Sequence, residues 1–381
     1  MRMRKILSLG LPGWRWAALA FALVVAGAVA TPILAQDATI TRWPLPIRPE
    51  NIALDPSGQV WATIAKGNGY QNTMYRLDPA NDQLTTYTHP FALGDSLGMA
   101  IDSDGLVWFT ANTVGGSRIN RLDPATGNIT GWPATESGYA VALDTLSGDV
   151  WFNCGSALCR LDPDTNTIAS WTLDSKPTAI SVDGQGKVWH VRPDALKVGV
   201  LDPLTNSLTE WSAPGTTMSG TPQTILVDGA DKVWFTVWVH SGDEVTGGEV
   251  VRLDAATNMM TEWACPPGAC FGPSDMLVDG AGDVWFAEWG TKIDRFCLNC
   301  SGRFDAYIDR LDPTADPPVF TRWKVKDQLG YSYPNIYSWN PGPDQILVDG
   351  GGAAWILYCM TSPWPYGWGD ADLSYLDRLQ P

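Results

Sequence analysis

Four of the acidic residues in this chain are candidates to hold a divalent cation together. They are Glu50, Asp275, Glu288 and Asp344. Oxygen atoms are the ligands that Mg²⁺ and Ca²⁺ prefer, so these four residues are the candidate metal ligands. A carboxylate or an imidazole next to such a site can also act as a general base, and Asp344 and His240 are the candidates for that role.

Aromatic residues form a second candidate site, in the longest segments between repeated units of the chain. The candidate ligand-binding residues are Trp238, Trp289, Trp339, Trp364, Trp368 and Tyr333. Aromatic side chains on variable segments of a rigid scaffold commonly build binding sites. The alternative is that these residues form a small apolar cluster of their own over the last two units.

The elements that must position these residues follow from an internal repeat. An Asp-Gly-type turn followed by Val-Trp or a close variant occurs seven times, ending at Trp61, Trp108, Trp151, Trp189, Trp234, Trp285 and Trp355. Gly and Asp supply turn dihedrals, whereas Val and Trp favour strands. A phrase such as Arg-Leu-Asp-Pro and then a Thr-x-Trp strand follow most copies. Each unit therefore predicts four short antiparallel strands, and seven units predict an all-β, seven-bladed β-propeller.

The two ends of the chain predict how the ring closes. The seventh unit stops at Pro381 without a Thr-x-Trp strand, whereas such a strand occurs near the start, at Ile40-Thr-Arg-Trp43. We expect this N-terminal strand to complete the last blade, which removes two exposed sheet edges. The propeller is then one domain that runs from residue 37 to residue 381.

This topology gathers the candidate residues at one end of the central channel. In a four-stranded blade, the short turns lie on one face and the long connecting segments lie on the other. Inner strands begin on the face of the long segments, so we expect Asn51 and the four carboxylates at the channel mouth, with Glu288 reaching it from the second strand of its blade. A metal ion would relieve the repulsion between converging carboxylates. The alternatives are separate, solvated carboxylates or pairing with Arg192.

The repeated unit as a whole resembles the streptogramin lyases, also called virginiamycin B lyases. The similarity extends over all seven units, and its best single match is Val284-Trp-Phe-Ala-Glu288-Trp289-Gly290-Thr-Lys-Ile293. The resemblance implies a seven-bladed propeller and a magnesium-assisted elimination that opens a cyclic depsipeptide. In that family, histidines follow the Pro that opens the inner strands of the sixth and seventh blades, whereas Ser274 and Asp344 hold those positions here.

The composition and the start of the chain bear on its compartment. The 381 residues carry a formal net charge of −16, which repels phosphate backbones and excludes nucleic acid as an expected partner. Residues 1–35 combine a basic start with a long apolar run and small residues, as in a secretory signal peptide. The alternative is a retained membrane anchor. We expect a secreted or periplasmic protein with no other membrane segment.

Six of the seven cysteines form close pairs in sequence. The disulfide candidates are Cys154 with Cys159, Cys265 with Cys270, and Cys297 with Cys300. Local disulfides are the expected state in an oxidising compartment. The Cys297–Cys300 spacing is also compatible with a redox pair or half of a zinc site.

These observations favour a monomeric binding module for a small-molecule, glycan or peptide ligand. The alternative is an enzyme, a divalent-metal-dependent carbon–oxygen lyase or lactonase that opens a cyclic ester with the family's histidines replaced. A purely structural scaffold is the third reading. The expected cofactor is Mg²⁺ or Ca²⁺, or otherwise none.

Overall fold

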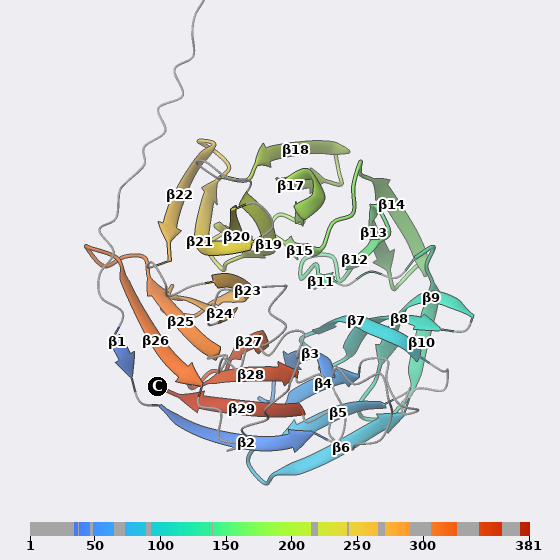
Figure 1. Ribbon diagram of the computed structural model, residues 1–381. Helices are drawn as coiled ribbons and strands as arrows, with labels where there is room; N and C mark the ends of the chain where they lie inside the picture. Colours follow the sequence, from blue (N-terminus) through green and yellow to red (C-terminus); the bar gives the residue numbers. More distant parts are fainter. Residues whose placement is uncertain are drawn as a thin grey trace, which may run out of the picture.

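The predicted seven-bladed β-propeller is confirmed (Figure 1). The computed structural model describes residues 34–36, 38–45, 49–64, 73–88, 93–113, 115–136, 138, 140–214, 220–241, 244–265, 271–289, 306–325, 343–359 and 374–381. Across these ranges, seven antiparallel sheets of four strands surround a central axis, and one of them carries a fifth, parallel strand. The one helical element in these ranges is a single 3-10 turn, η1 (Pro193–Ala195). None of the described helices is long and apolar enough to cross a membrane.

The blades are numbered 1 to 7 in chain order. Blade 1 contains β3 (Pro49–Leu54), β4 (Val60–Ile64), β5 (Thr73–Asp78) and β6 (Gln83–Thr88). Blade 2 contains β7 (Leu93–Ile101), β8 (Val107–Thr113), β9 (Gly116–Leu122) and β10 (Ile129–Pro133). Blade 3 contains β11 (Val141–Leu143), β12 (Val150–Cys154), β13 (Ala157–Asp162) and β14 (Thr167–Thr172). Blade 4 contains β15 (Ala179–Val182), β16 (Val188–Arg192), β17 (Lys197–Asp202) and β18 (Ser207–Ser212).

The remaining three blades follow the same order from the axis outward. Blade 5 contains β19 (Gly220–Val227), β20 (Val233–Ser241), β21 (Glu244–Asp254) and β22 (Met259–Ala264). Blade 6 contains β23 (Phe271–Val278), β24 (Val284–Trp289), β25 (Ala306–Asp312) and β26 (Val319–Val325). Blade 7 contains β27 (Pro343–Val348), β28 (Ala354–Cys359), β29 (Ser374–Gln380) and β2 (Thr39–Leu45).

The repeated phrase, in which an Asp precedes the Trp by six residues in six of the seven blades, is a self-contained turn. In blade 1, one oxygen of Asp55 accepts hydrogen bonds from the backbone N–H groups of Ser57 and Gln59, and the other accepts from Trp61 Nε1 at 3.0 Å. The same Asp-to-Trp bond, six residues apart in sequence, occurs in every blade except blade 3. The carboxylate thus satisfies the turn amides and fixes the indole that packs between blades.

Aromatic residues of the second and fourth strands pack against each other across the third strand. In each blade the Trp of the turn phrase lies with its ring centroid 5.0–5.7 Å from a Trp or Tyr of the outermost strand. An arginine of the third strand lies over the turn-phrase Trp in six blades, for example Arg310 at 5.5 Å from the centroids of both Trp285 and Trp323. Blade 4 has Val200 at this position. The repeated tryptophans therefore belong to the core.

The ring closes by the predicted route. Strand β2 pairs antiparallel with β29, with Thr41 opposite Arg378 and Pro44 opposite Tyr375, and so completes blade 7. Arg42 and Asp377 reinforce this pairing, since Arg42 Nε and Nη2 donate to the two carboxylate oxygens at 2.7 and 2.6 Å. A further strand that the sequence did not indicate, β1 (Leu34–Gln36), pairs parallel with β26 at the outer edge of blade 6.

Candidate functional site

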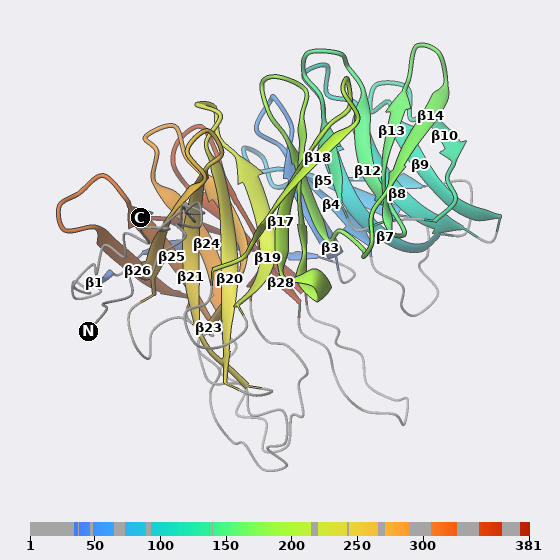
Figure 2. The same cartoon turned by 90° about the horizontal axis from the view of Figure 1, so that it is seen from above.

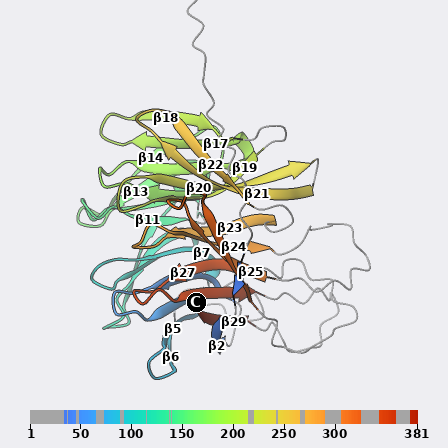
Figure 3. The same ribbon diagram turned by 90° about the vertical axis from the view of Figure 1, so that its left-hand side faces the viewer.

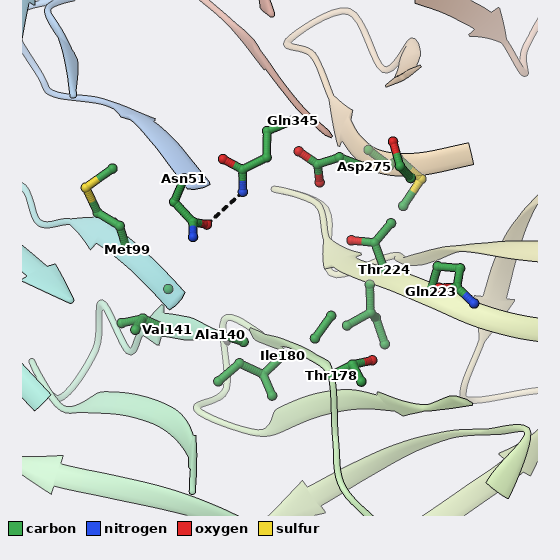
Figure 4. A pocket seen from close by; sticks show the side chains of 15 residues that line it. Asn51, Met99, Ala140, Val141, Thr178, Ile180, Gln223, Thr224, Asp275 and Gln345 are labelled. Atoms are coloured by element: carbon green, nitrogen blue, oxygen red, sulfur yellow. Dashed lines mark hydrogen bonds between the residues drawn. The ribbon is translucent and has the colours of Figure 1, made fainter. Parts of the chain in front are cut away.

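A cavity of about 330 Å³ lies on the axis of the ring, where the inner strands of all seven blades meet (Figures 1 and 4). Its polar lining residues are Asn51, Thr178, Gln223, Thr224, Ser274, Asp275 and Gln345. The apolar part of the lining comes from residues such as Met99, Ile180 and Ile225. The volume is at the lower end of the range typical of small-molecule sites.

Prolines at or near the start of four inner strands explain why polar side chains face this cavity. Proline lacks the N–H that a strand ladder needs, so pairing is interrupted beside it. The register shifts by one residue after Pro49, Pro222, Pro273 and Pro343. Such β-bulges redirect side chains, and Asn51, Gln223, Thr224 and Ser274, which lie at these shifts, all line the cavity.

Hydrogen bonds between neighbouring blades hold the lining in place. Gln345 Nε2 donates to Asn51 Oδ1 at 2.8 Å, and Gln345 Oε1 accepts from the backbone N–H of Ile52 at 2.5 Å, so blades 7 and 1 are joined at the axis. Asp275 Oδ2 accepts from the backbone N–H of Ile346 at 3.1 Å, which joins blades 6 and 7. Figure 4 shows Gln345 and Asp275 facing the same space.

Asp275 is the one charged residue of the cavity lining within the described part of the chain. It is half-buried because the cavity beside it is accessible, but protein surrounds it on its other sides. Burial raises the pKa of Asp275 to about 6, although backbone hydrogen bonds from Ile346 and Met276 oppose the shift. A partly desolvated carboxylate is therefore present on the axis, and none of the described lining residues beside it is cationic.

Glu288 does not face the channel, and the expectation that it reaches the mouth is wrong. Its side chain is fully buried inside blade 6, where it forms an ion pair with Arg322. Arg322 also donates to Asp309 at 2.8 Å and lies 4.5 Å from the ring centroid of Tyr307. Burial raises the pKa of Asp309 to about 6 against the opposing charge of Arg322. The requirement that a buried carboxylate be paired decides where Glu288 points.

Trp238 and His240 extend from β20 beside the start of blade 6, and neither lines the axial cavity. Trp238 Nε1 donates to the backbone carbonyl of Pro273 at 2.8 Å, and its ring lies against Gly272, whose φ of +79° lets the chain turn there. Figure 3 shows β21, the partner of β20, extending past the neighbouring strands. Within the described residues, Trp238 thus holds the entry to β23, the strand that carries Asp275.

Several other predicted site residues lie outside the described residues. These are Trp339, Trp364, Trp368 and Tyr333, together with the side chains of Glu50, Trp289 and Asp344, whose backbones belong to β3, β24 and β27. The roles expected of them remain predictions.

The described side chains do not by themselves form a divalent-metal site. Of the four candidate ligands, Asp275 lines the cavity and Glu288 is engaged with Arg322. No group of three or more His, Cys, Asp or Glu side chains suited to a metal ion occurs in the described ranges. Arg192 is not the partner of the axial carboxylate either, because it pairs with Asp174 and Glu210.

Sequence reasoning missed four polar residues of the lining, Thr178, Gln223, Thr224 and Gln345. A signal was present, because Thr178 follows directly on Pro177, Gln223 and Thr224 are the first and second residues after Pro222, and Gln345 is the second residue after Pro343. Ser274 and Asp344 also follow directly on a proline, but only the resemblance to the lyase family singled them out.

Two of the cysteine predictions can be followed in the structure. Cys154 and Cys159 form a disulfide across the hairpin of β12 and β13, as expected. Cys265 is also disulfide-bonded. Cys270, Cys297 and Cys300 lie outside the described ranges.

Comparisons with solved structures agree with this architecture. The protein is similar to selenomethionine-substituted virginiamycin B lyase from Staphylococcus aureus, with 20% sequence identity and a TM-score of 0.64, over 91% of this chain and 100% of that one. It is also similar to hydrazine synthase from Kuenenia stuttgartiensis, with 11% identity and a TM-score of 0.58, over 87% of this chain and 96% of that one. At these identities the similarities show the fold alone.

The family comparison is more specific. No curated protein matches the sequence. The family model described as the Virginiamycin B lyase family matches residues 14–296, which is more than half of the chain. The match extends across blades 1 to 5 and into blade 6, and it includes the segment from Val284 to Ile293 on which the resemblance rests. This chain is a member of the virginiamycin B lyase family.

Proposed function

We propose that this protein is an exported binding protein that takes a small polar ligand in its axial cavity. One observation supports this proposal. The β-bulges that follow prolines place neutral polar side chains from several blades around the axial cavity. A purely structural scaffold does not need such a lining. Apolar residues could fill the axis without the free-energy cost of burying polar groups that lack hydrogen bonds. Convergent polar groups in a preformed cavity are typical of ligand sites.

The aromatic residues of the long segments extend the proposed site. Inner strands begin on the face from which these segments leave, so Trp289, Trp339, Trp364, Trp368 and Tyr333 are expected around the entrance to the cavity. Aromatic rings there would stack on a flat or sugar-like part of the ligand. Trp238 would stabilise the strand beside this entrance, β23, through its hydrogen bond to the backbone carbonyl of Pro273.

Export is supported by two features. The chain starts with a basic and then apolar segment of the secretory type. The disulfide between Cys154 and Cys159 suits an oxidising compartment outside the cytoplasm.

The test of the binding function combines ligand screening with cavity-filling variants. The full mature chain is screened by saturation-transfer NMR against a panel of sugars, amino acids, amines and small organic acids. Thr178→Met and Thr224→Met place a larger side chain in the cavity, so compounds that bind wild type should lose their signal in both variants. Thr130→Met makes the same change on the exposed outer strand β10 and should leave the signal unchanged.

Two outcomes contradict the proposal. One is that no compound of the panel binds wild type. The other is that the compounds that bind are retained by both cavity variants, provided that thermal unfolding shows both to be folded. The second outcome would place the binding site away from the axis.

Membership of the virginiamycin B lyase family favours a second candidate, a lyase or lactonase that opens a cyclic ester. Asp344 and His240 are the expected bases for this reaction, although His240 does not line the axial cavity. Incubation with a streptogramin B-type cyclic depsipeptide and with a panel of lactones, with and without Mg²⁺, tests it. Mass spectrometry should detect ring opening that Asp344→Ala abolishes, and unchanged substrate under all conditions would rule the candidate out.

A further inference from the structure

The carboxylate on the axis differs from the ion-paired carboxylates that are buried within the blades. Asp377 is paired with Arg42, and Glu288 and Asp309 share Arg322. Asp275, by contrast, accepts only backbone hydrogen bonds, from Ile346 and Met276. None of the described residues that line the cavity is Lys, Arg or His. Among the described lining residues, the axis therefore carries an anion and no counter-ion.

The neutral polar groups that line the cavity together with Asp275 indicate which cation would fit. Thr178, Thr224 and Ser274 contribute hydroxyl oxygens, and Gln223 contributes an amide. A primary ammonium group has three N–H donors, which a carboxylate and hydroxyl or amide oxygens can accept together. A divalent metal ion favours several anionic ligands, and the described lining offers one. One negative charge among neutral acceptors is matched by a monovalent organic cation.

The size of the cavity limits the ligand further. A volume of about 330 Å³ suits a molecule of roughly monosaccharide size rather than a polymer chain. Hydroxyl groups on the ligand would supply both donors and acceptors for the hydroxyl groups of Thr178 and Thr224. The ligand chemistry that fits is a small, hydroxylated amine.

We propose that the axial cavity binds a small molecule with a primary ammonium group, which pairs with Asp275, and with hydroxyl groups that hydrogen-bond to the neutral lining. This inference rests on the proposed binding function, since it names the ligand class of the same cavity. It assigns to Asp275 the role of selecting charge and to Thr178, Gln223 and Thr224 the role of orienting the ligand.

The experiment uses matched pairs of probes that differ in the charged group. Glucosamine is compared with glucose, and ethanolamine is compared with ethylene glycol, by calorimetric or NMR titration at pH 7. Wild type is expected to bind at least one amine about tenfold or more tightly than its neutral counterpart, the preference that one desolvated charge pair commonly produces. Asp275→Asn keeps the shape of the side chain and an acceptor oxygen, and it should remove that preference.

Two controls separate charge selection from general effects. Asp164→Asn makes the same change on an exposed turn and should leave the preference intact. N-acetylglucosamine, which keeps the sugar but loses the positive charge, should bind no better than glucose. Thermal unfolding of Asp275→Asn shows whether the variant is folded.

The inference is overturned if wild type binds neither amine better than its neutral counterpart, or if the preference survives in Asp275→Asn. The binding function itself is tested separately. If glucose or another neutral compound binds wild type and is lost in Thr178→Met and Thr224→Met, the cavity is a ligand site and only its charge selection is refuted. If no compound binds at all, both proposals fail.

Discussion

Asp275 is the residue on which the proposed site depends most. It is held by backbone donors of blades 6 and 7, it faces the cavity, and no cationic side chain among the described lining residues compensates its charge. Such an arrangement costs folding free energy, because burial disfavours the ionised form. Residues that reduce stability in this way are commonly found where function requires them.

This cost leads to a prediction about stability and pH. The folded-state pKa of Asp275, about 6, lies above its unfolded value of 3.8, so the folded protein binds the proton more tightly. Its contribution to the free energy of unfolding is therefore greatest below about pH 4, falls as pH rises through the interval to about 6, and is constant above it. Asp275→Asn should raise the free energy of unfolding at pH 7 by about 1–3 kcal/mol, with little gain at pH 4.

Urea denaturation at pH 4, 5.5 and 7 measures this difference. Asp55→Asn is the matched control, and its expected effect on the free energy of unfolding has the opposite sign. Although burial raises the pKa of Asp55, hydrogen bonds from Ser57, Trp61 and the turn backbone lower it on balance. The control variant should be less stable than wild type at pH 7. A loss of stability in Asp275→Asn at pH 7 would show that the carboxylate is not desolvated as described.

At the residue scale, the sequence predicts position better than orientation. It places Asn51 and Asp275 on inner strands, and both line the cavity. It fails for Glu288, because the partner that captures this side chain, Arg322, lies two strands away in the sheet and 34 residues later in the chain. A diagonal ion pair across a sheet leaves no local pattern, whereas a proline that opens a strand does.

At the scale of elements, each blade is a repetition of one turn and one strand pattern, and the exceptions are informative. Blade 3 has one more residue between the turn Asp and the Trp, from Asp144 to Trp151. Trp151 Nε1 is buried there and has no hydrogen-bond partner among the described residues. Sequence alone predicts all seven turns because Gly, Asp and Trp recur, but it does not reveal that the longer turn breaks the Asp-to-Trp bond.

Deletion of Leu146 should repair this turn. The deletion restores the spacing of six residues between Asp144 and Trp151, and it removes a side chain that is 68% exposed. Satisfying a buried indole N–H should stabilise the protein by about 1 kcal/mol. Thermal unfolding measures the gain, and the same deletion combined with Asp144→Ala should not show it. A destabilised deletion variant would mean that the longer turn is itself required for packing.

At the scale of the whole molecule, closure of the ring brings residues from opposite ends of the chain to one axis. The N-terminal strand β2 pairs with the C-terminal strand β29 (Figure 1), and Gln345 of blade 7 donates a hydrogen bond to Asn51 of blade 1 (Figure 4). Figure 2 shows the C-terminal end of the chain near β1 and β26. The sequence predicts this closure because the last unit lacks the strand that the start of the chain supplies. It does not predict β1, whose three residues carry no repeated pattern and pair with β26 through the backbone.

The Arg42–Asp377 ion pair is expected to carry much of the stability of the closure. Asp377 is fully buried, so Arg42→Ala leaves an unpaired carboxylate in the sheet and should lower the free energy of unfolding by about 3–5 kcal/mol. Arg160→Ala is the control, because its pair with Asp149 is longer, at 3.5 Å, and more exposed. Its effect on chemical denaturation should be about 1 kcal/mol. Equal effects of the two variants would show that the closure does not depend on this pair.

The measurement that tests the central claim most directly is a crystal structure of the full mature chain grown with the tightest-binding compound of the screening panel. The account predicts that the compound occupies the axial cavity, within hydrogen-bond distance of the Asp275 carboxylate and the Thr224 hydroxyl, and that crystals of Thr224→Met lack it there. A compound bound on any other surface, with only water on the axis, would contradict the account.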